Sequence, residues 1–401
     1  MRDRLRAVLP LLHRVPLSEL PQRVLVLGLA RSGKAASAAL GRRGVEVVGV
    51  DRELGNEDDL TLLDGVELLV KSPGVPRGSP LVAEAERRGL PIWSEVELGY
   101  RLLQPRLVGV TGTNGKTTTV ELLGAITGAP VAGNVGRALT ELDGRVATGS
   151  LVVCELSSFQ LEDVHELACE VAVLLNLEAD HLDRYDSFEA YRNAKLRIFE
   201  RARAKVVPRG LGLEGTEFAA DDPLPAEPRI RGAHNRENAA AATAAARLLG
   251  ISDEAIAEAL LTFPGVPHRL EPVCELRGVL YVNDSKATNV AAALKALSTF
   301  EREPVHLILG GSRKGEDFEP LAAAIGPNVK SVHLIGETAG ELAEAIPQAQ
   351  RDGDLAGALG AIEADPGDVV LLSPACASYD QFRDFEERGE EFRRLVQNLS
   401  G

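Results

Sequence analysis

The fold of this chain is decided by the stretch Leu107-Val-Gly-Val-Thr-Gly-Thr-Asn-Gly-Lys-Thr-Thr-Thr119. Its apolar start predicts a buried strand, a glycine-rich turn follows, and the pattern that continues through Ile126 predicts a helix. Such a turn points backbone N–H groups at phosphate, while Lys116 adds a cation and Thr117 a hydroxyl for Mg²⁺. Val110 stands where the common phosphate loop has its first glycine, so the motif is a variant.

A second strand-turn-helix unit is expected upstream of this loop. Val24–Leu27 predicts a strand that enters the turn Gly28-Leu-Ala-Arg-Ser-Gly33, and a second predicted strand, Val45–Val50, ends at Asp51. An acidic residue about 20 positions after such a turn is typical of dinucleotide-binding units, so the motif alone favours NAD. Ala30 replaces the middle glycine of that pattern, and a tight turn without a ligand is the alternative.

The region after the phosphate loop contains two more predicted buried strands. Leu151–Glu155 ends in a carboxylate, which suits Mg²⁺ beside a phosphate loop. Val171–Leu175 leads to Asp180-His181-Leu-Asp183, and a predicted helix through Glu200 carries Lys195. On sequence alone, His181 and Lys195 fit ordinary surface residues.

The last part of the chain alternates predicted strands and helices, which indicates a mostly parallel sheet. The strands are Val279–Val282, Val305–Leu309, Ser331–Ile335 and Val369–Leu372. Polar loops follow three of them, at Asn283–Asn289, Gly310–Gly315 and Ser373–Asp380. Loops at the carboxyl ends of parallel strands are where open α/β sheets bind ligands. The segment Gln381–Val396 predicts only an amphipathic closing helix.

The composition excludes several functional classes. The chain has 401 residues, of which 45% are hydrophobic and 26% charged, as in soluble proteins of two or three domains. A net charge of −15 argues against a nucleic-acid-binding surface. We find no export signal and no apolar run long enough to predict a membrane span. The four cysteines match neither a zinc site nor a disulfide framework, which predicts a cytoplasmic protein with reduced thiols.

These elements predict an α/β protein of three domains. Residues 1–95 would form a Rossmann-like domain, and residues 96–265 a central ATP-binding domain built on the phosphate loop and a mostly parallel sheet. Residues 266–401 would form a second Rossmann-like α/β domain, which begins after Pro264-Gly-Val-Pro267.

With its motifs in this order, the chain resembles the Mur ligases over essentially its whole length. The motif Gly-Thr-Asn-Gly-Lys-Thr is shared by that superfamily, including folylpolyglutamate synthases, and selects no substrate. The narrower markers are Lys71-Ser-Pro-Gly-Val-Pro76, Glu155-Leu-Ser-Ser-Phe-Gln160, Asn283-Asp-Ser-Lys-Ala-Thr-Asn289 and Ser373-Pro-Ala-Cys-Ala-Ser378 with Asp380-Gln-Phe382. The Asp-Asn-Pro-Arg sequence of many diaminopimelate- or lysine-adding relatives is absent.

The resemblance implies a reaction and its partners. The implied reaction is the ATP-dependent addition of D-glutamate to UDP-N-acetylmuramoyl-L-alanine through an acyl phosphate, a step of peptidoglycan precursor synthesis. The enzyme is then expected to be a cytoplasmic monomer with small-molecule substrates. Its cofactors would be ATP, two Mg²⁺ ions and a carbamylated lysine.

The resemblance also assigns roles to matching positions. For the UDP substrate they are Gly28, Ala30, Arg31, Ser32, Asp51, Arg52, Gly74, Asn134 and Gln160, although Arg31 and Ser32 depart from the family's apolar residue and threonine. For ATP they are Gly112, Thr113, Asn114, Gly115, Lys116, Thr117, Thr118, Asn235, Asn238, Arg269 and Asp284. For D-glutamate they are Thr288, Lys314, Ser378 and Phe385. One Mg²⁺ would be held by Thr117 and Glu155, the other by His181 and carbamylated Lys195, and the catalytic residues would be Lys116, His181, Lys195 and Lys286.

Several other functions remain open at this point. Another amino-acid-adding Mur-type ligase or a folylpolyglutamate synthase-like ligase would share most of the motifs. A nucleotide-binding regulatory ATPase would not need the loops that carry Lys286, Thr288 and Lys314. A nicotinamide-dependent oxidoreductase built on Gly28–Asp51 would leave the Gly-Lys-Thr loop unexplained.

Overall fold

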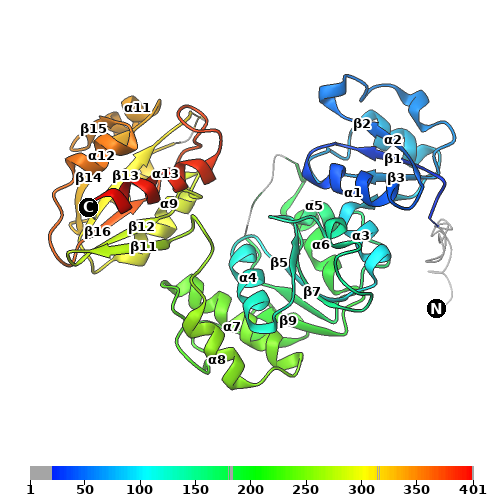
Figure 1. Ribbon diagram of the computed structural model, residues 1–401, viewed down its shortest axis with the longest axis horizontal. Helices are drawn as coiled ribbons and strands as arrows, with labels where there is room; N and C mark the ends of the chain where they lie inside the picture. The colour runs from blue at the N-terminus through cyan, green and yellow to red at the C-terminus, as the bar shows by residue number, and fades with distance from the viewer. Residues whose placement is uncertain (1–19, 179, 181–183, 314, 316, 400–401) are drawn as a thin grey trace. The chain divides into compact units, whose positions relative to one another are not determined.

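The computed structural model describes residues 20–178, 180, 184–313, 315 and 317–399. His181 and Lys314 therefore lie outside the described residues. The chain divides into two compact units: unit 1 contains residues 1–227 and 237–260, and unit 2 contains residues 228–236 and 261–401. Three sheets make up their frame, and in each of them the strands run parallel, apart from one antiparallel edge pair (Figure 1). The prediction of an α/β fold with mostly parallel sheets is confirmed.

The first sheet of unit 1 has the strand order β2-β1-β3-β4. Its strands are β1 (Arg23–Leu27), β2 (Glu46–Val50), β3 (Leu68–Lys71) and β4 (Ile92–Ser94), and its helices are α1 (Arg31–Gly41), α2 (Pro80–Arg87) and α3 (Glu95–Leu103). Successive side chains of a strand point to opposite faces. Leu25 accordingly packs with Leu81 of α2, and Val26 packs with Leu40 of α1. Helices therefore cover both faces of this sheet.

The second sheet of unit 1 has the order β10-β9-β8-β5-β7-β6. Its strands are β5 (Arg106–Thr111), β6 (Val131–Gly133), β7 (Leu151–Glu155), β8 (Val171–Leu174), β9 (Ala204–Pro208) and β10 (Thr216–Phe218). The helices that follow in this part of the chain are α4 (Lys116–Thr127), α5 (Ser158–Leu161), α6 (Phe188–Leu196), α7 (Ala233–Leu248) and α8 (Asp253–Thr262). Strand β5 lies between β7 and β8, so the phosphate loop at its carboxyl end is flanked by the ends of two other strands. Such a position is typical of ligand sites in α/β sheets.

The sheet of unit 2 has the order β11-β12-β16-β13-β14-β15. Its strands are β11 (Glu271–Leu276), β12 (Val279–Asn283), β13 (Val305–Gly310), β14 (Val329–Ile335), β15 (Gln350–Gly353) and β16 (Val369–Leu372). The helices are α9 (Val290–Leu297), α10 (Glu319–Ala324), α11 (Ala339–Ala345), α12 (Leu355–Ala361) and α13 (Phe385–Asn398). Leu307 and Leu309 pack in one core with residues of α9, whereas Ile308 packs in another with Phe392 of α13. β11 pairs antiparallel with β12 at the edge.

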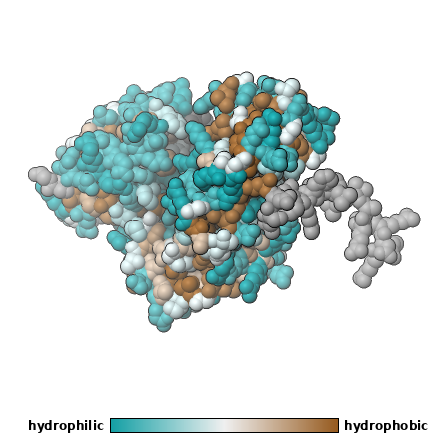
Figure 2. Space-filling model, turned by 45° about the vertical axis from the view of Figure 1, so that its right-hand side comes forward, coloured by the Kyte–Doolittle hydropathy of each residue, from teal (hydrophilic) through white to brown (hydrophobic). Residues whose placement is uncertain are grey.

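The surface of the described residues carries hydrophobic side chains at scattered positions. Hydrophilic and hydrophobic residues are intermixed on the face shown in Figure 2. Among the large exposed hydrophobic residues are Leu54, Leu261 and Tyr379. None of the described helices has the length and apolar character that crossing a bilayer requires.

Candidate functional site

The phosphate loop of unit 1 depends on two glycines. Gly112 has φ +155° and Gly115, which precedes the first residue of α4, has φ +83°. Residues that carry a side chain rarely adopt such backbone angles. A Cβ atom at Gly115 would also lie 2.2 Å from Oδ1 of Asn238. The loop therefore brings Asn238 of α7 against the start of α4, where backbone N–H groups can reach a phosphate.

Three residues that the sequence did not single out hold this loop in place. Asn114 donates its backbone N–H to Oδ1 of Asn176 over 2.8 Å, and its side-chain amide donates to Glu178 over 2.8 Å. The Thr113 and Tyr191 hydroxyl groups lie 3.0 Å apart. Asn176 and Glu178 follow strand β8, so their position after a neighbouring strand was the signal that could have found them.

Two lysines converge on the carbonyl oxygen of Gly112. The Lys116 ammonium donates to it over 2.8 Å and to the Thr113 carbonyl over 2.9 Å, and Lys195 donates to Gly112 over 2.8 Å. Lys195 is only 2% exposed, so its interpretation as a surface lysine is wrong. Its Nζ atom lies 4.6 Å from the ring centre of Tyr191. Burial, followed by the positive charge of Lys116, lowers the pKa of Lys195 to about 7.

Glu155 offers an oxygen atom to a cation. This residue ends β7 beside Val110 of β5, and its Oε1 atom accepts a 3.0 Å hydrogen bond from the Asn134 amide. Its Oε2 atom is buried and has no hydrogen-bond partner among the described residues. A buried carboxylate oxygen without a partner calls for a ligand. The Glu155 Oε2 atom and the Thr117 hydroxyl in the first turn of α4 are both hard oxygen donors of the kind that Mg²⁺ binds.

Within the described part of the chain, no cluster of three His, Cys, Asp or Glu side chains fits a metal ion. The residues present fit Mg²⁺ because this ion keeps several water ligands and takes one or two carboxylates together with substrate phosphates. His181, expected at a second metal site, lies outside the described residues.

Gln160 is another buried side chain with a polar atom that has no hydrogen-bond partner among the described residues. It belongs to α5, and its Oε1 atom accepts from the Ser157 backbone over 3.0 Å. Its Nε2 atom is buried without a hydrogen-bond partner among the described residues. Gln160 lies five positions after Glu155, so one short segment supplies two of the buried polar atoms that have no hydrogen-bond partner among the described residues.

The turn Gly28–Gly33 is tied to Asp51 and to the loop after β3. Asp51 accepts hydrogen bonds from the backbone of Glu53 (2.9 Å) and Leu29, which together lower its pKa. The Ser72 hydroxyl donates to the Gly28 carbonyl over 2.7 Å. A Cβ atom at Gly33 would lie 1.8 Å from that same carbonyl oxygen, so only glycine fits there. The predicted elements of a nucleotide site are therefore brought together.

The remaining predicted residues of this part differ in their surroundings. Arg31 donates to the Gly136 carbonyl over 3.0 Å and so reaches the loop that carries Asn134. The Arg52 side chain is 90% exposed and pairs with Glu57 over 3.9 Å. Ala30 caps the start of α1, Ser32 lies in the first turn of that helix, and Gly74 lies in the loop after β3.

In unit 2, the loop after β12 brings several predicted residues together. The Lys286 ammonium lies 5.6 Å from the ring centre of Phe385, and Thr288 donates its N–H to the Lys286 carbonyl over 2.9 Å. Asp284 accepts hydrogen bonds from the Leu270 N–H (3.1 Å) and the Ser373 hydroxyl (2.7 Å). Burial raises the pKa of Asp284 to about 7.

The predicted residues around Arg269 and the start of α7 have local contacts. Arg269 donates its backbone N–H to the Val266 carbonyl over 3.1 Å. Asn235, which lies within the first turn of α7, donates its side-chain amide to the Arg231 carbonyl over 2.7 Å. Ser378 is buried in the loop after β16.

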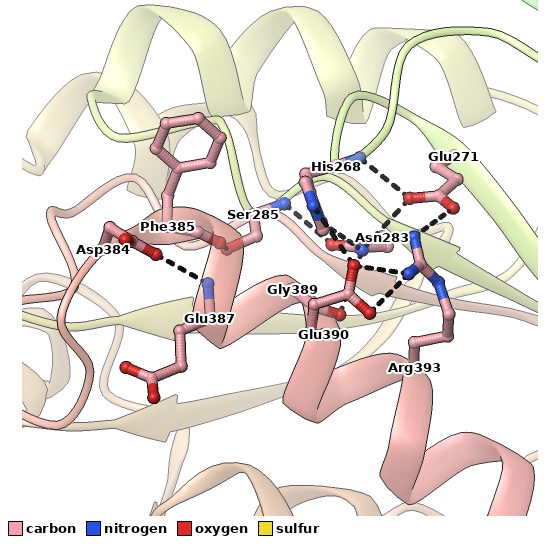
Figure 3. A network of polar contacts seen from close by, with 10 residues as sticks. All are labelled: His268, Glu271, Asn283, Ser285, Asp384, Phe385, Glu387, Gly389, Glu390 and Arg393. Atoms are coloured by element: carbon pink, nitrogen blue, oxygen red, sulfur yellow. Dashed lines mark hydrogen bonds and ion pairs between the residues drawn. The ribbon is translucent and has the colours of Figure 1, made fainter. Parts of the chain in front are cut away.

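Figure 3 shows how helix α13 holds the segment next to Arg269. Nδ1 of His268 lies 3.1 Å from the Asn283 side-chain amide, which also donates to the Gly389 carbonyl over 3.2 Å. A Cβ atom at Gly389 would lie 2.1 Å from that imidazole nitrogen, so glycine allows the close approach. Glu271 accepts from the His268 N–H (2.8 Å) and from Arg393 of α13 (2.6 Å).

Arg388 is a functional candidate that the sequence analysis missed, because α13 was expected only to close the fold. It is 1% exposed and donates to both oxygen atoms of Ser285, over 2.9 Å to the hydroxyl and 2.8 Å to the carbonyl. It also donates to the carbonyl groups of Cys376 and Ala377, each over 3.1 Å. One guanidinium thus joins the loops after β12 and β16. The available signal was its spacing of four residues before Phe392, on the buried face of the helix.

Known proteins are similar to this chain in sequence and in fold. Residues 110–209 match the Mur ligase middle domain, and residues 268–376 match the Mur ligase, glutamate ligase domain. The UDP-N-acetylmuramoylalanine–D-glutamate ligase of Anaeromyxobacter dehalogenans is 41% identical, and the match covers 93% of this chain and 97% of the relative. The enzyme of that name from Desulfitobacterium hafniense is 42% identical, with 94% and 97% covered. The chain belongs to this family of Mur ligases.

A solved structure supports the fold of the ligase independently. The UDP-N-acetylmuramate-alanine ligase of Thermotoga maritima superposes with a TM-score of 0.62 at 20% identity, covering 94% of this chain and 99% of that one. Membership of the family rules out the nicotinamide-dependent oxidoreductase and the regulatory ATPase as descriptions of this ligase.

Proposed function

We propose that this protein carries out the reaction of its family, the ATP-dependent addition of D-glutamate to UDP-N-acetylmuramoyl-L-alanine in peptidoglycan synthesis. The proposal rests above all on the phosphate loop, where Lys116 and Lys195 meet at Gly112. The unpartnered carboxylate oxygen of Glu155 lies at the end of the adjacent strand.

The first step would activate the alanine carboxylate. A carboxylate oxygen attacks the γ-phosphorus of ATP, a P–O bond forms, and the P–O bond to ADP breaks. Both reactants are anions, so catalysis consists mainly of holding them in line and neutralising their charge. Lys116 and the backbone N–H groups at the start of α4 would do this, with Asn238 packed against the loop.

Mg²⁺, when bound, would supply further positive charge to the phosphate oxygens. Thr117 and Glu155 would hold it, because they offer a hydroxyl and a buried carboxylate oxygen. Other residues of the phosphate loop would also contribute to ATP binding, namely Thr113, Asn114 and Thr118. In unit 2, the residues expected to bind ATP are Asn235, Arg269 and Asp284.

The second step would form the amide bond. The D-glutamate nitrogen attacks the acyl carbon, an N–C bond forms, the C–O bond to phosphate breaks, and phosphate leaves. The amine must lose its proton, and His181 is the candidate acceptor. Lys286 would neutralise the departing phosphate, while Thr288, Lys314, Ser378 and Phe385 would hold D-glutamate; Lys286 and Phe385 are already neighbours.

Lys195 would carry a carbamate. Because its pKa is lowered to about 7, a large share of its amine is unprotonated at neutral pH and able to attack CO₂. An N–C bond forms, one proton is released, and the neutral amine becomes an anionic carbamate. This change would relieve the repulsion between Lys195 and Lys116 and supply, with His181, oxygen and nitrogen ligands for a second Mg²⁺.

The UDP substrate would bind at the first sheet of unit 1. The turn from Gly28 to Ser32 would face the diphosphate, and Asp51, Arg52 and Gly74 would face the uridine. Asn134 and Gln160 would contact the muramoyl part, and Gln160 has a buried amide group available for this purpose. Arg31 would add a cation beside the diphosphate.

The organisation of the enzyme follows from the same proposal. Residues 1–95 would form the UDP-substrate domain, residues 96–265 the ATPase domain, and residues 266–401 the amino-acid domain. The three separate sheets support this division. The enzyme would act in the cytoplasm as a monomer.

The proposal can be tested by measuring phosphate release from ATP in the presence of UDP-N-acetylmuramoyl-L-alanine. Each member of a panel of D- and L-amino acids is added in turn as the second substrate. We expect release that depends on D-glutamate and is abolished in Lys116→Ala. Preference for another amino acid would indicate a different Mur-type ligase, and release without an amino acid would contradict ligation.

A further inference from the structure

The loop Ser72–Pro76, between β3 and α2, lies at the proposed site of the UDP substrate. Its first residue donates to the carbonyl of Gly28, so the loop and the diphosphate turn are joined. Gly74 lines an open cavity with Arg77 and Tyr185, and a Cβ atom at Gly74 would meet no neighbour within 4 Å. A side chain does not hold Gly74 in place, so the hydrogen bonds of its two neighbours matter for its position.

Arg184, from the segment that precedes α6, supplies those hydrogen bonds. Its Nη1 atom donates to the Pro73 carbonyl over 2.6 Å, and its Nη2 atom donates to the Val75 carbonyl over 3.1 Å. The two acceptors flank Gly74 on either side. The guanidinium carbon lies 3.7 Å from the ring centre of Phe159, so the plane of the group is supported by an aromatic ring.

A second group of contacts fastens the start of the same loop. Lys71, which ends β3 and is 1% exposed, pairs with Asp163 over 2.8 Å and with Glu162 over 3.5 Å. The Tyr185 hydroxyl donates to Glu162, and its ring stacks on Phe159 with centroids 5.8 Å apart. Residues in the segments that connect strands of the second sheet of unit 1 thus hold the loop of the first sheet at two points.

The neighbours of these contacts are proposed substrate residues. Arg184 directly follows Asp183 in the segment that contains His181. Phe159, which supports the guanidinium, directly precedes Gln160 with its unpartnered amide. One guanidinium thus connects the neighbours of Gly74 with Phe159, so a change in its geometry would displace Gly74 relative to Gln160, and both are proposed substrate residues.

We infer that Arg184 is a positioning residue for UDP-N-acetylmuramoyl-L-alanine, fixing Gly74 against the part of the chain that holds Gln160. The inference rests on the proposed function. Lysine cannot take its place, since an ammonium lacks the planar pair of donors that reaches two carbonyl groups while stacking on a ring.

Steady-state kinetics and calorimetry on Arg184→Lys and Arg184→Met test this inference. We expect both variants to raise the KM for the UDP substrate and its calorimetric Kd about ten- to a hundred-fold, the loss expected for charged hydrogen bonds. The KM for ATP and the melting temperature of Arg184→Lys should stay near wild-type values. Arg192→Ala is the matched control, because Arg192 is a cation of the adjacent α6 that pairs only with Glu189 of the same helix among the described residues.

An unchanged KM and Kd for the UDP substrate in both variants would overturn the role of Arg184, and so would an equal rise in the KM values for ATP and the UDP substrate. Restoration of the wild-type KM by lysine would also overturn it, since charge alone would then suffice. Absence of D-glutamate-dependent phosphate release in the wild-type enzyme would instead contradict the proposed function, so the two failures are distinguishable.

Discussion

Lys116 and Lys195 donate to one acceptor, the carbonyl oxygen of Gly112, each over 2.8 Å. Two ammonium groups that share one acceptor repel each other, and Lys195 is buried as well. Burial and the charge of Lys116 therefore favour the unprotonated amine at Lys195. This pair makes Lys195 reactive at a pH where an exposed lysine is protonated.

We predict that Lys195 binds CO₂ as a carbamate in the active enzyme. Incubation with ¹³C-labelled bicarbonate at pH 8 should give a carbamate resonance by NMR in the wild-type protein and none in Lys195→Arg, whose guanidinium stays protonated. Lys195→Arg should lose most of the activity. Lys205→Arg, which changes a lysine of β9, should retain both the signal and the activity. An unmodified Lys195 in fully active enzyme would refute the prediction.

Glu155→Gln should weaken Mg²⁺ binding without unfolding unit 1. The amide retains an oxygen that can accept from Asn134, but the buried negative oxygen is lost. We expect the Mg²⁺ concentration for half-maximal activity to rise about ten-fold or more. Glu170→Gln removes a surface carboxylate paired with Arg106 and should leave that concentration unchanged. An unaltered Mg²⁺ requirement in Glu155→Gln would remove Glu155 from the metal site.

Asp284→Asn should change how the stability of the protein depends on pH. The folded pKa of Asp284 is about 7, above the ordinary value of 3.8, so the native state holds a proton that the unfolded state releases between these values. The free energy of unfolding therefore falls as the pH rises from about 4 to 7, by at most about 1.4 kcal/mol per pH unit from this group.

Asparagine does not titrate, so the variant should gain stability relative to wild type as the pH rises through this range. Denaturant unfolding of both proteins at pH 5, 6 and 7 measures the difference. A difference that stays constant across the three pH values would show that Asp284 is ionised throughout.

Gly115→Ala should weaken nucleotide binding, because the added methyl group both strains the backbone and collides with a neighbouring side chain. Gly115 and Gly128 flank the two ends of α4, and both have positive φ angles, +83° and +67°. A Cβ atom at Gly115 would collide with Asn238, whereas one at Gly128 would meet nothing within 4 Å. We expect Gly128→Ala to cost about 1 kcal/mol of stability with normal ATP binding. Gly115→Ala should also raise the Kd for ATP, and equal ATP affinities in the two variants would contradict the collision.

The strands could be predicted where apolar runs are long enough. The predicted strands that carried such runs are confirmed in all three sheets. Leu151–Glu155 and Val369–Leu372 have the same bounds in the structure, and the others differ by one or two residues at an end. Strand β15, Gln350–Gly353, was missed because it is polar and lies at a sheet edge, where no burial pattern marks it. Short strands such as β4 and β6 likewise contain too few residues to show a period.

The phosphate loop was determined by the sequence itself. Gly112, Gly115 and Lys116 lie within five positions, so their backbone angles and hydrogen bonds arise from neighbours along the chain. Tertiary structure alone decided the environment of three other cations. Lys195 meets Gly112 across 83 positions, Arg388 meets Ser285 across 103, and Arg184 meets Pro73 across 111. Whether such a side chain is solvated or buried depends on which distant backbone groups the fold brings against it, and the pKa of Lys195 and the hydrogen bonds of both arginines follow from that burial.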